Sequence, residues 1–222
     1  LVPLILLLIP CYLVIQQPDL GTSILIAGTG IIIIWLAGLN VKYFVYSGLL
    51  LIVSLPFAVS LLKPYQKSRI LTFFNPDRDP LGAGYQIIQS KIAIGSGGFF
   101  GKGFLKGTQS YLEFLPEKHT DFIFTLFSEE FGFLGSIMLL LLYILLIYRI
   151  ISIGFYAKSF FSKLFCFGFA SAIFLYIFVN ISMVLGLLPI VGAPLPIMSY
   201  GGSSMLSIML GLSIVMSCKI YS

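Results

Sequence analysis

The chain has 222 residues, of which 59% are hydrophobic and only 9% are charged. A soluble domain carries about 25% charged residues, so this composition excludes an ordinary water-soluble protein. The net charge of +5 does not indicate nucleic-acid binding, because Lys and Arg lie in connections between apolar segments rather than on one polar face. The three cysteines lack the spacing of a metal site and are interpreted as packing residues.

Apolar segments recur along the chain, and a membrane crossing takes roughly 20 helical residues. We predict six crossing segments, at residues 1–16, 22–39, 43–62, 122–148, 164–188 and 203–216. The first is short for a crossing, and the chain does not begin with Met, so we expect further helices before it. The sequence therefore predicts an all-α, polytopic membrane bundle, with residues 1–222 as a single domain that is incomplete at its N-terminus.

The connections between these segments indicate their orientation, because Lys and Arg concentrate on the cytoplasmic side. One set of connections contains basic residues only, namely Lys42, Arg149, Lys158, Lys163 and Lys219. The other set contains Asp19, which we expect to cap the following helix, together with residues 63–120 and 189–202. These three stretches are predicted to lie together on the extracytoplasmic face.

Residues 63–120 form the large extracytoplasmic loop of this prediction. Within it, Tyr85, Ile88 and Ile92 recur at helical spacing, which predicts an amphipathic helix lying against the membrane. The glycine-rich run at residues 95–103 is interpreted as a flexible turn. The alternative is a backbone nest that holds a lipid pyrophosphate together with Lys102 and Lys106.

The end of this loop gathers ionisable side chains directly before the next apolar segment. They are Glu117, Lys118, His119 and Asp121. One interpretation makes Thr120 the N-cap of the helix and Asp121 a first-turn carboxylate favoured by the helix dipole. The other makes Asp121 a general base that reaches the head group of a lipid-linked substrate. The residues by themselves leave both interpretations open.

Three further polar features lie within the apolar segments or at their ends. Glu129 and Glu130 are expected to find hydrogen-bonding partners, because acidic side chains are costly there. Asn180 is expected to bond between helices. The prolines, glycines and hydroxyls of residues 194–204 predict a re-entrant or tightly packed loop, in which Ser199 has either a structural role or a contact with substrate.

Several of these motifs resemble the SEDS family (shape, elongation, division and sporulation). The resemblance covers nearly the whole chain in the family's order, at residues 17–23, 75–98, 107–124 and 194–202. Gly-Thr-Gln-Ser at residues 107–110, followed by residues 112–121, resembles the elongation branch more than the division branch.

The resemblance implies a ten-helix bundle, of which this chain holds the last six helices, that polymerises lipid II into peptidoglycan at the outer face of the bacterial plasma membrane. Asp121 matches an acidic residue held to be essential in the family, with the implied role of general base. The candidate substrate-binding residues are Lys102, Lys106, Glu117, Lys118, His119 and Ser199. Lys, Arg or a divalent cation, Mg or Mn, is expected to stabilise the leaving pyrophosphate, and no organic cofactor is expected.

The resemblance also implies partners, namely a class B penicillin-binding protein and other membrane proteins of the elongation complex. Two alternatives to a polymerase stay open. A lipid II flippase would fit the intramembrane acidic residues, although transporters usually show repeat symmetry and none is visible here. A non-catalytic scaffold would only recruit a synthase to the cell-wall machinery.

Overall fold

The computed structural model describes residues 2–17, 19–61, 64–79, 82–107 and 119–220. Its helices, in chain order, are α1 (Val2–Gln16), α2 (Leu20–Leu36), α3 (Val41–Leu61), α4 (Pro64–Phe74), the 3₁₀ turn η1 (Pro76–Arg78), α5 (Ala83–Ser96), α7 (Ile123–Tyr156), α8 (Phe160–Val184) and α9 (Gly202–Ile220). The described residues contain no β-strand, and the predicted all-α class is confirmed.

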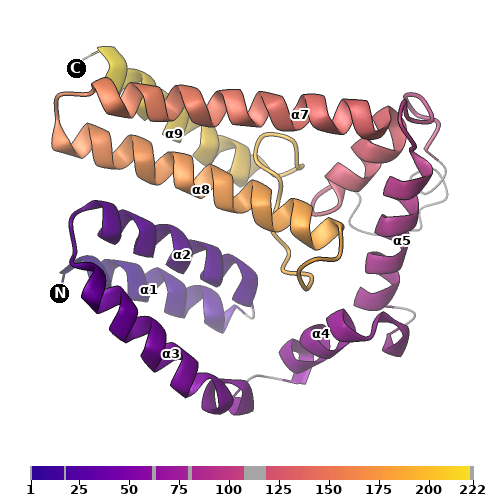
Figure 1. Ribbon diagram of the computed structural model, residues 1–222, viewed down its shortest axis with the longest axis horizontal. Helices are drawn as coiled ribbons and strands as arrows, with labels where there is room; N and C mark the ends of the chain where they lie inside the picture. Colours follow the sequence, from indigo (N-terminus) through magenta and orange to yellow (C-terminus); the bar gives the residue numbers. More distant parts are fainter. Residues whose placement is uncertain (1, 18, 62–63, 80–81, 108–118, 221–222) are drawn as a thin grey trace.

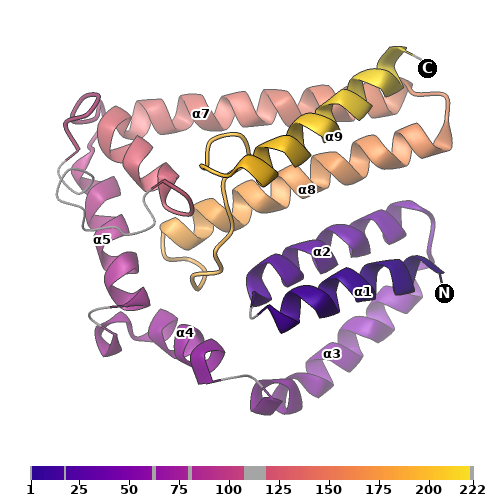
Figure 2. The ribbon, with the colours of Figure 1, turned by 180° about the vertical axis from the view of Figure 1, so that it is seen from behind.

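The apolar helices pack lengthwise against one another (Figures 1 and 2). Helices α7, α8 and α9 form one group, and α2 lies between α1 and α8. Helices α4 and α5 lead along one side of the molecule to the start of α7 (Figure 1). The α2–α3 and α7–α8 connections and the C-terminus lie at one end of the helices, and the α8–α9 connection and α5 lie toward the other.

Three of the helices, α7, α8 and α9, are long and apolar enough to cross a membrane, and α1 and α2 are shorter apolar helices. Their outer faces expose large apolar side chains, such as Leu141, Leu142 and Leu145, each of which is more than half exposed. Such surfaces fit lipid rather than water as the solvent. Each of the six predicted apolar segments coincides with a helix, as expected for part of a polytopic membrane protein.

The predicted amphipathic helix of the long loop is present as α5, but the face that packs on the bundle is not the predicted apolar stripe. The buried positions of α5 are Gly84, Ile87, Ser90 and Ala93. They pack toward α7 and α8, and the Ser90 hydroxyl donates to the Val184 carbonyl at 2.9 Å. Ile92, from the predicted stripe, is 48% exposed. The spacing of large apolar residues did not reveal this packing face, because two of its four residues are glycine and serine.

Helix α7 is broken at Gly132, whose φ of 66° and ψ of −162° are non-helical. The break removes two helical hydrogen bonds, those from the N–H groups of residues 133 and 134 to the carbonyls of residues 129 and 130. All four groups find partners in the glycine-rich turn. Lys102 N–H and Gly103 N–H donate to the carbonyls of 129 and 130 at 3.1 and 3.0 Å, and Phe133 and Leu134 donate to Gly98 and Phe99 at 2.9 and 3.1 Å.

The glycine-rich turn, residues 97–103, is therefore an ordered connector rather than a flexible segment. The alternative of a backbone nest loses three of its donors here, because the N–H groups of residues 101, 102 and 103 are all bonded to carbonyls of the chain. Glycine is required where the two backbones meet, since a Cβ on Gly132 would overlap the backbone of Gly101.

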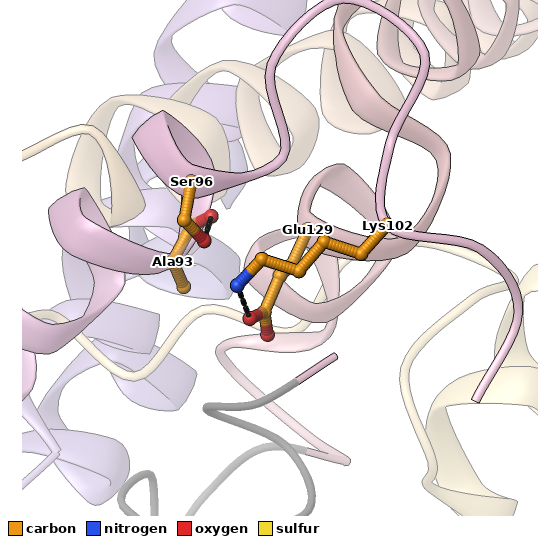
Figure 3. Close-up of polar contacts among 4 residues, drawn as sticks. All are labelled: Ala93, Ser96, Lys102 and Glu129. Atoms are coloured by element: carbon orange, nitrogen blue, oxygen red, sulfur yellow. Dashed lines mark hydrogen bonds and ion pairs between the residues drawn. The ribbon is translucent and has the colours of Figure 1, made fainter. Parts of the chain in front are cut away.

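An ion pair joins the side chains of the same two segments. The Lys102 ammonium lies 2.7 Å from the Glu129 carboxylate (Figure 3), and Glu129 is fully buried whereas the Lys102 side chain is 26% exposed. A carboxylate within an apolar helix needs such a partner, and the expected hydrogen-bonding role of Glu129 is confirmed.

We expect Gly132→Ala to lower the melting temperature of the detergent-solubilised protein strongly. Its φ and ψ lie in a region that is essentially restricted to glycine, and the strain alone costs about 1–3 kcal/mol. The matched control is Gly95→Ala on α5, where a Cβ would meet nothing within 4 Å. Equal melting temperatures for the two variants would contradict the assignment of the break as a glycine-dependent junction.

We expect Lys102→Met to destabilise the protein by about 2–3 kcal/mol, because it leaves the buried carboxylate of Glu129 without its cation. The double variant Lys102→Met/Glu129→Gln removes both charges and should recover most of that loss. Lys106→Met, at an exposed position of the same loop, is the control. Thermal unfolding in detergent checks the order, and a double variant no more stable than the single would show that the pair is not coupled.

Candidate functional site

The backbone directly before α7 is held by two distant parts of the chain. Three consecutive carbonyls, those of His119, Thr120 and Asp121, each accept one hydrogen bond. The donors are the Tyr200 N–H at 2.9 Å, the Ser199 hydroxyl at 2.7 Å and the Asn180 side-chain amide at 2.8 Å. We call these three carbonyls and their three donors the junction. It brings together the end of the long loop, α8 and the α8–α9 connection.

The α8–α9 connection is tightly packed, as predicted. Ala193 and Leu195 are fully buried, and the Asn180 amide also donates to the Ala193 carbonyl at 2.6 Å. The Tyr143 hydroxyl of α7 donates to the Pro196 carbonyl at 2.6 Å. These bonds satisfy polar backbone that would otherwise be buried without a partner.

The predicted meeting of Asp19, the long loop and the α8–α9 connection is confirmed. The Asp19 carboxylate accepts from the Thr22 N–H at 3.0 Å and caps α2 as expected. A Cβ on Gly21, in the first turn of α2, would overlap Val191 of the connection. The start of α2 therefore lies against the same connection that holds the residues before α7.

Asp121 lies at the junction with its side chain partly exposed. Its carboxylate faces Gly192 of the connection, where a Cβ would stand 3.5 Å from Oδ2. The neighbouring Phe122 is 1% exposed and occupies the N-cap position of α7 without a side-chain cap bond. The alternative that placed the N-cap at Thr120 is wrong by two residues, because the first helical hydrogen bonds run from the N–H groups of Thr125 and Leu126 to the Phe122 carbonyl.

An open hollow of about 620 Å³ adjoins the junction. Its lining includes His119, Ile123, Ser199, Tyr200 and Met205. Asp121 itself is not one of the lining residues, but His119, two positions before it, is. A carboxylate held by a fixed backbone can take a proton from a bound hydroxyl, provided that the hydroxyl comes within about 2.6–3.2 Å.

The other predicted site residues are distributed around this region. Lys102 is engaged by Glu129, Lys106 is exposed, and the His119 side chain is exposed at the hollow. Ser199 is 6% exposed and bonds to the backbone of its own chain. Glu117 and Lys118 lie outside the described residues.

The expected divalent cation finds no ready ligand set in the described part of the chain. No group of three or more His, Cys, Asp or Glu side chains occurs there in an arrangement that could hold a metal ion. Mg²⁺ usually keeps several waters and is held by one or two carboxylates together with substrate phosphates, so a cluster of three protein ligands is not required. The divalent cation therefore stays a prediction.

Sequence reasoning underestimated two residues. Asn180 was expected to bond to another helix. Its hydrogen-bond partners do lie outside α8, but they are the backbone carbonyls of Asp121 and Ala193, which precede α7 and belong to the α8–α9 connection. Nothing in the apolar sequence around Tyr143 indicated its hydrogen bond to the α8–α9 connection. For Asn180 the sequence did offer one indication, because an amide side chain inside an apolar helix is costly unless it is hydrogen-bonded.

The family described as "Cell cycle protein" (FtsW, RodA and SpoVE) matches residues 1–222. The peptidoglycan glycosyltransferase MrdB of Escherichia coli K12 is 50% identical over 217 residues, which are 97% of this chain and 59% of MrdB. The chain thus spans about three fifths of the length of this relative.

Solved structures show the same likeness. A chain in a peptidoglycan synthase complex, described as coordinating polymerization and crosslinking, superposes with a TM-score of 0.78 at 35% identity, over 99% of this chain and 60% of that one. Rod shape determining protein RodA of Thermus thermophilus superposes with a TM-score of 0.61 at 28% identity, over 100% of this chain and 56% of that one. The chain therefore belongs to the FtsW, RodA and SpoVE family, which is the SEDS family that its motifs predict, and its likeness to RodA agrees with the expected elongation branch.

Proposed function

We propose that the protein is a peptidoglycan glycosyltransferase that extends glycan strands from lipid II during cell elongation and rod-shape maintenance. The name and 50% identity of the Escherichia coli relative support this activity. The observation that carries the proposal is the Asp121 carboxylate, presented by a backbone whose three consecutive carbonyls are hydrogen-bonded. A reaction that needs one positioned carboxylate fits this arrangement.

In the proposed reaction Asp121 is the general base. Its carboxylate takes the proton from the acceptor sugar hydroxyl while that oxygen attacks the anomeric carbon of the donor. The bond from the anomeric carbon to the pyrophosphate oxygen breaks, and undecaprenyl pyrophosphate leaves with the bonding electrons. Because pyrophosphate leaves without being protonated, one carboxylate suffices, unlike the paired acids of glycoside hydrolysis.

The departing pyrophosphate needs positive charge nearby. Among the described candidates Lys106 suits this role better than Lys102, whose ammonium already faces the buried carboxylate of Glu129. His119, at the hollow, is a candidate for binding the sugar moieties, and Glu117 and Lys118 keep their predicted roles in substrate binding.

We further propose that the protein is a multi-pass protein of the bacterial plasma membrane with its active face outside. The predicted basic connections support this orientation, since the α2–α3 and α7–α8 connections and the C-terminus share one end of the bundle (Figure 1). The junction belongs to connections that reach toward the other end. The proposed partner is a class B penicillin-binding protein within the elongation complex, supported by the likeness to a chain of a peptidoglycan synthase complex.

We expect Asp121→Asn in the full-length protein to reduce polymerisation of purified lipid II by about 10²–10⁴-fold, because the amide cannot accept the proton. Gel separation of labelled glycan strands measures the rate in the presence of the penicillin-binding partner. Asp77→Asn, at an exposed carboxylate of η1, is the matched control and should leave the rate unchanged.

Polymerisation at the wild-type rate by Asp121→Asn would move the chemistry to another residue. Transfer of labelled lipid II across sealed liposomes that contain only the wild-type protein would instead favour the flippase. Normal cell elongation by the Asp121→Asn strain would favour the scaffold.

A further inference from the structure

We propose that Asn180 and Ser199 are positioning residues, which hold the backbone at Asp121 so that its carboxylate meets the acceptor hydroxyl. The inference rests on the proposed function, in which Asp121 is the general base. Both side chains are buried, with exposed fractions of 0% and 6%, and each donates a hydrogen bond to a backbone carbonyl of the junction.

The amide of Asn180 joins two backbones that face each other across the site. Its nitrogen donates to the Asp121 carbonyl at 2.8 Å and to the Ala193 carbonyl at 2.6 Å. Since both neighbours are carbonyl oxygens, only the NH₂ group of the amide can face them, and both of its protons are used.

The second of these bonds matters to the carboxylate itself. Ala193 follows Gly192, the residue that the Asp121 carboxylate faces, and Gly192 has a φ of 76°. Asn180 therefore fixes the backbone of Asp121 and, through Ala193, the segment against which the Asp121 side chain rests. A side chain with a single donor could not hold both backbones.

Ser199 fixes the preceding peptide group. Its hydroxyl donates to the Thr120 carbonyl at 2.7 Å and accepts from the Leu195 N–H at 2.6 Å. A hydroxyl has one proton, and here that proton is committed to Thr120. With 6% of the side chain exposed, a role in holding the junction fits Ser199 better than contact with substrate.

Such bonds affect the rate through geometry. Proton transfer requires the carboxylate within hydrogen-bond reach of the hydroxyl, and a misplacement of about 1 Å can cost roughly 10²-fold. The three carbonyls paired by the junction lie directly before Phe122, the N-cap residue of α7, so these hydrogen bonds fix the backbone that leads into the helix.

The first measurement is steady-state polymerisation of lipid II by the full-length protein with its penicillin-binding partner, in Ser199→Ala and Asn180→Asp. We expect kcat to fall by about 10-fold or more, with the KM for lipid II changed less than about twofold, because substrate contacts are retained. Ser171→Ala on α8, where the hydroxyl bonds only to Gly168 of its own helix, is the control and should match wild type.

The second measurement reports on position without activity. In an Asp121→Cys background, the rate of labelling by a membrane-impermeant maleimide measures the exposure of that side chain. The three cysteines of this chain are buried and should react slowly, and the same protein with Asp121 intact gives the background rate of labelling. We expect Ser199→Ala and Asn180→Asp to change the labelling rate by about threefold or more, and Ser171→Ala to leave it unchanged.

The outcomes separate this inference from the proposed function. Unchanged labelling, or a rise in KM with kcat retained, would overturn the positioning role. Altered labelling together with full activity of Asp121→Asn would keep the junction but remove Asp121 as the base, and the catalytic part of the inference would fall with it. If Asn180→Asp does not fold, Ser199→Ala, which removes a single oxygen atom, decides the question.

Discussion

Backbone groups freed inside an apolar bundle must find partners within the chain, because neither lipid nor packed apolar side chains can bond to them, and the molecule is organised around this constraint. At the break in α7, the turn at residues 97–103 pairs all four groups that the helix releases. Ahead of α7, three consecutive carbonyls are paired by Asn180, Ser199 and Tyr200. Both solutions use chain that is distant in sequence, and together they hold the short helical piece between residues 123 and 131.

Two carboxylates, one just before this piece of α7 and one within it, have opposite environments. Glu129 is buried and faces the Lys102 ammonium at 2.7 Å, so its charge holds the glycine-rich turn against α7. Asp121 is partly exposed beside Gly192, where its carboxylate stays accessible. The difference in burial, rather than residue type, distinguishes the structural carboxylate from the proposed catalytic one.

Sequence signals were reliable where a residue and the group that it contacts lie within one helical turn of each other. Asp19 was predicted as a cap because an N-cap bonds to N–H groups two or three residues ahead, and it bonds to Thr22. The existence of α5 also followed from local spacing. Its packing face did not, because Ser90 is buried through a bond to Val184 in another helix. The glycine-rich turn was predicted to be flexible for a similar reason. Its glycines indicate conformational freedom, but nothing near them in the sequence indicates that the turn pairs with the break in α7.

The sequence by itself determined that lipid surrounds the helices, and it determined the helical class, the six apolar helices, the family and Asp121 as the candidate base. Composition, apolar spacing and short motifs carry that information, and all of them are local properties of the chain. The tertiary structure alone decided that Lys102 pairs with Glu129, that Asn180 reaches the Asp121 carbonyl and that Ser199 reaches Thr120. These bonds join residues 27, 59 and 79 positions apart, and at such separations the packing of whole helices selects the partner.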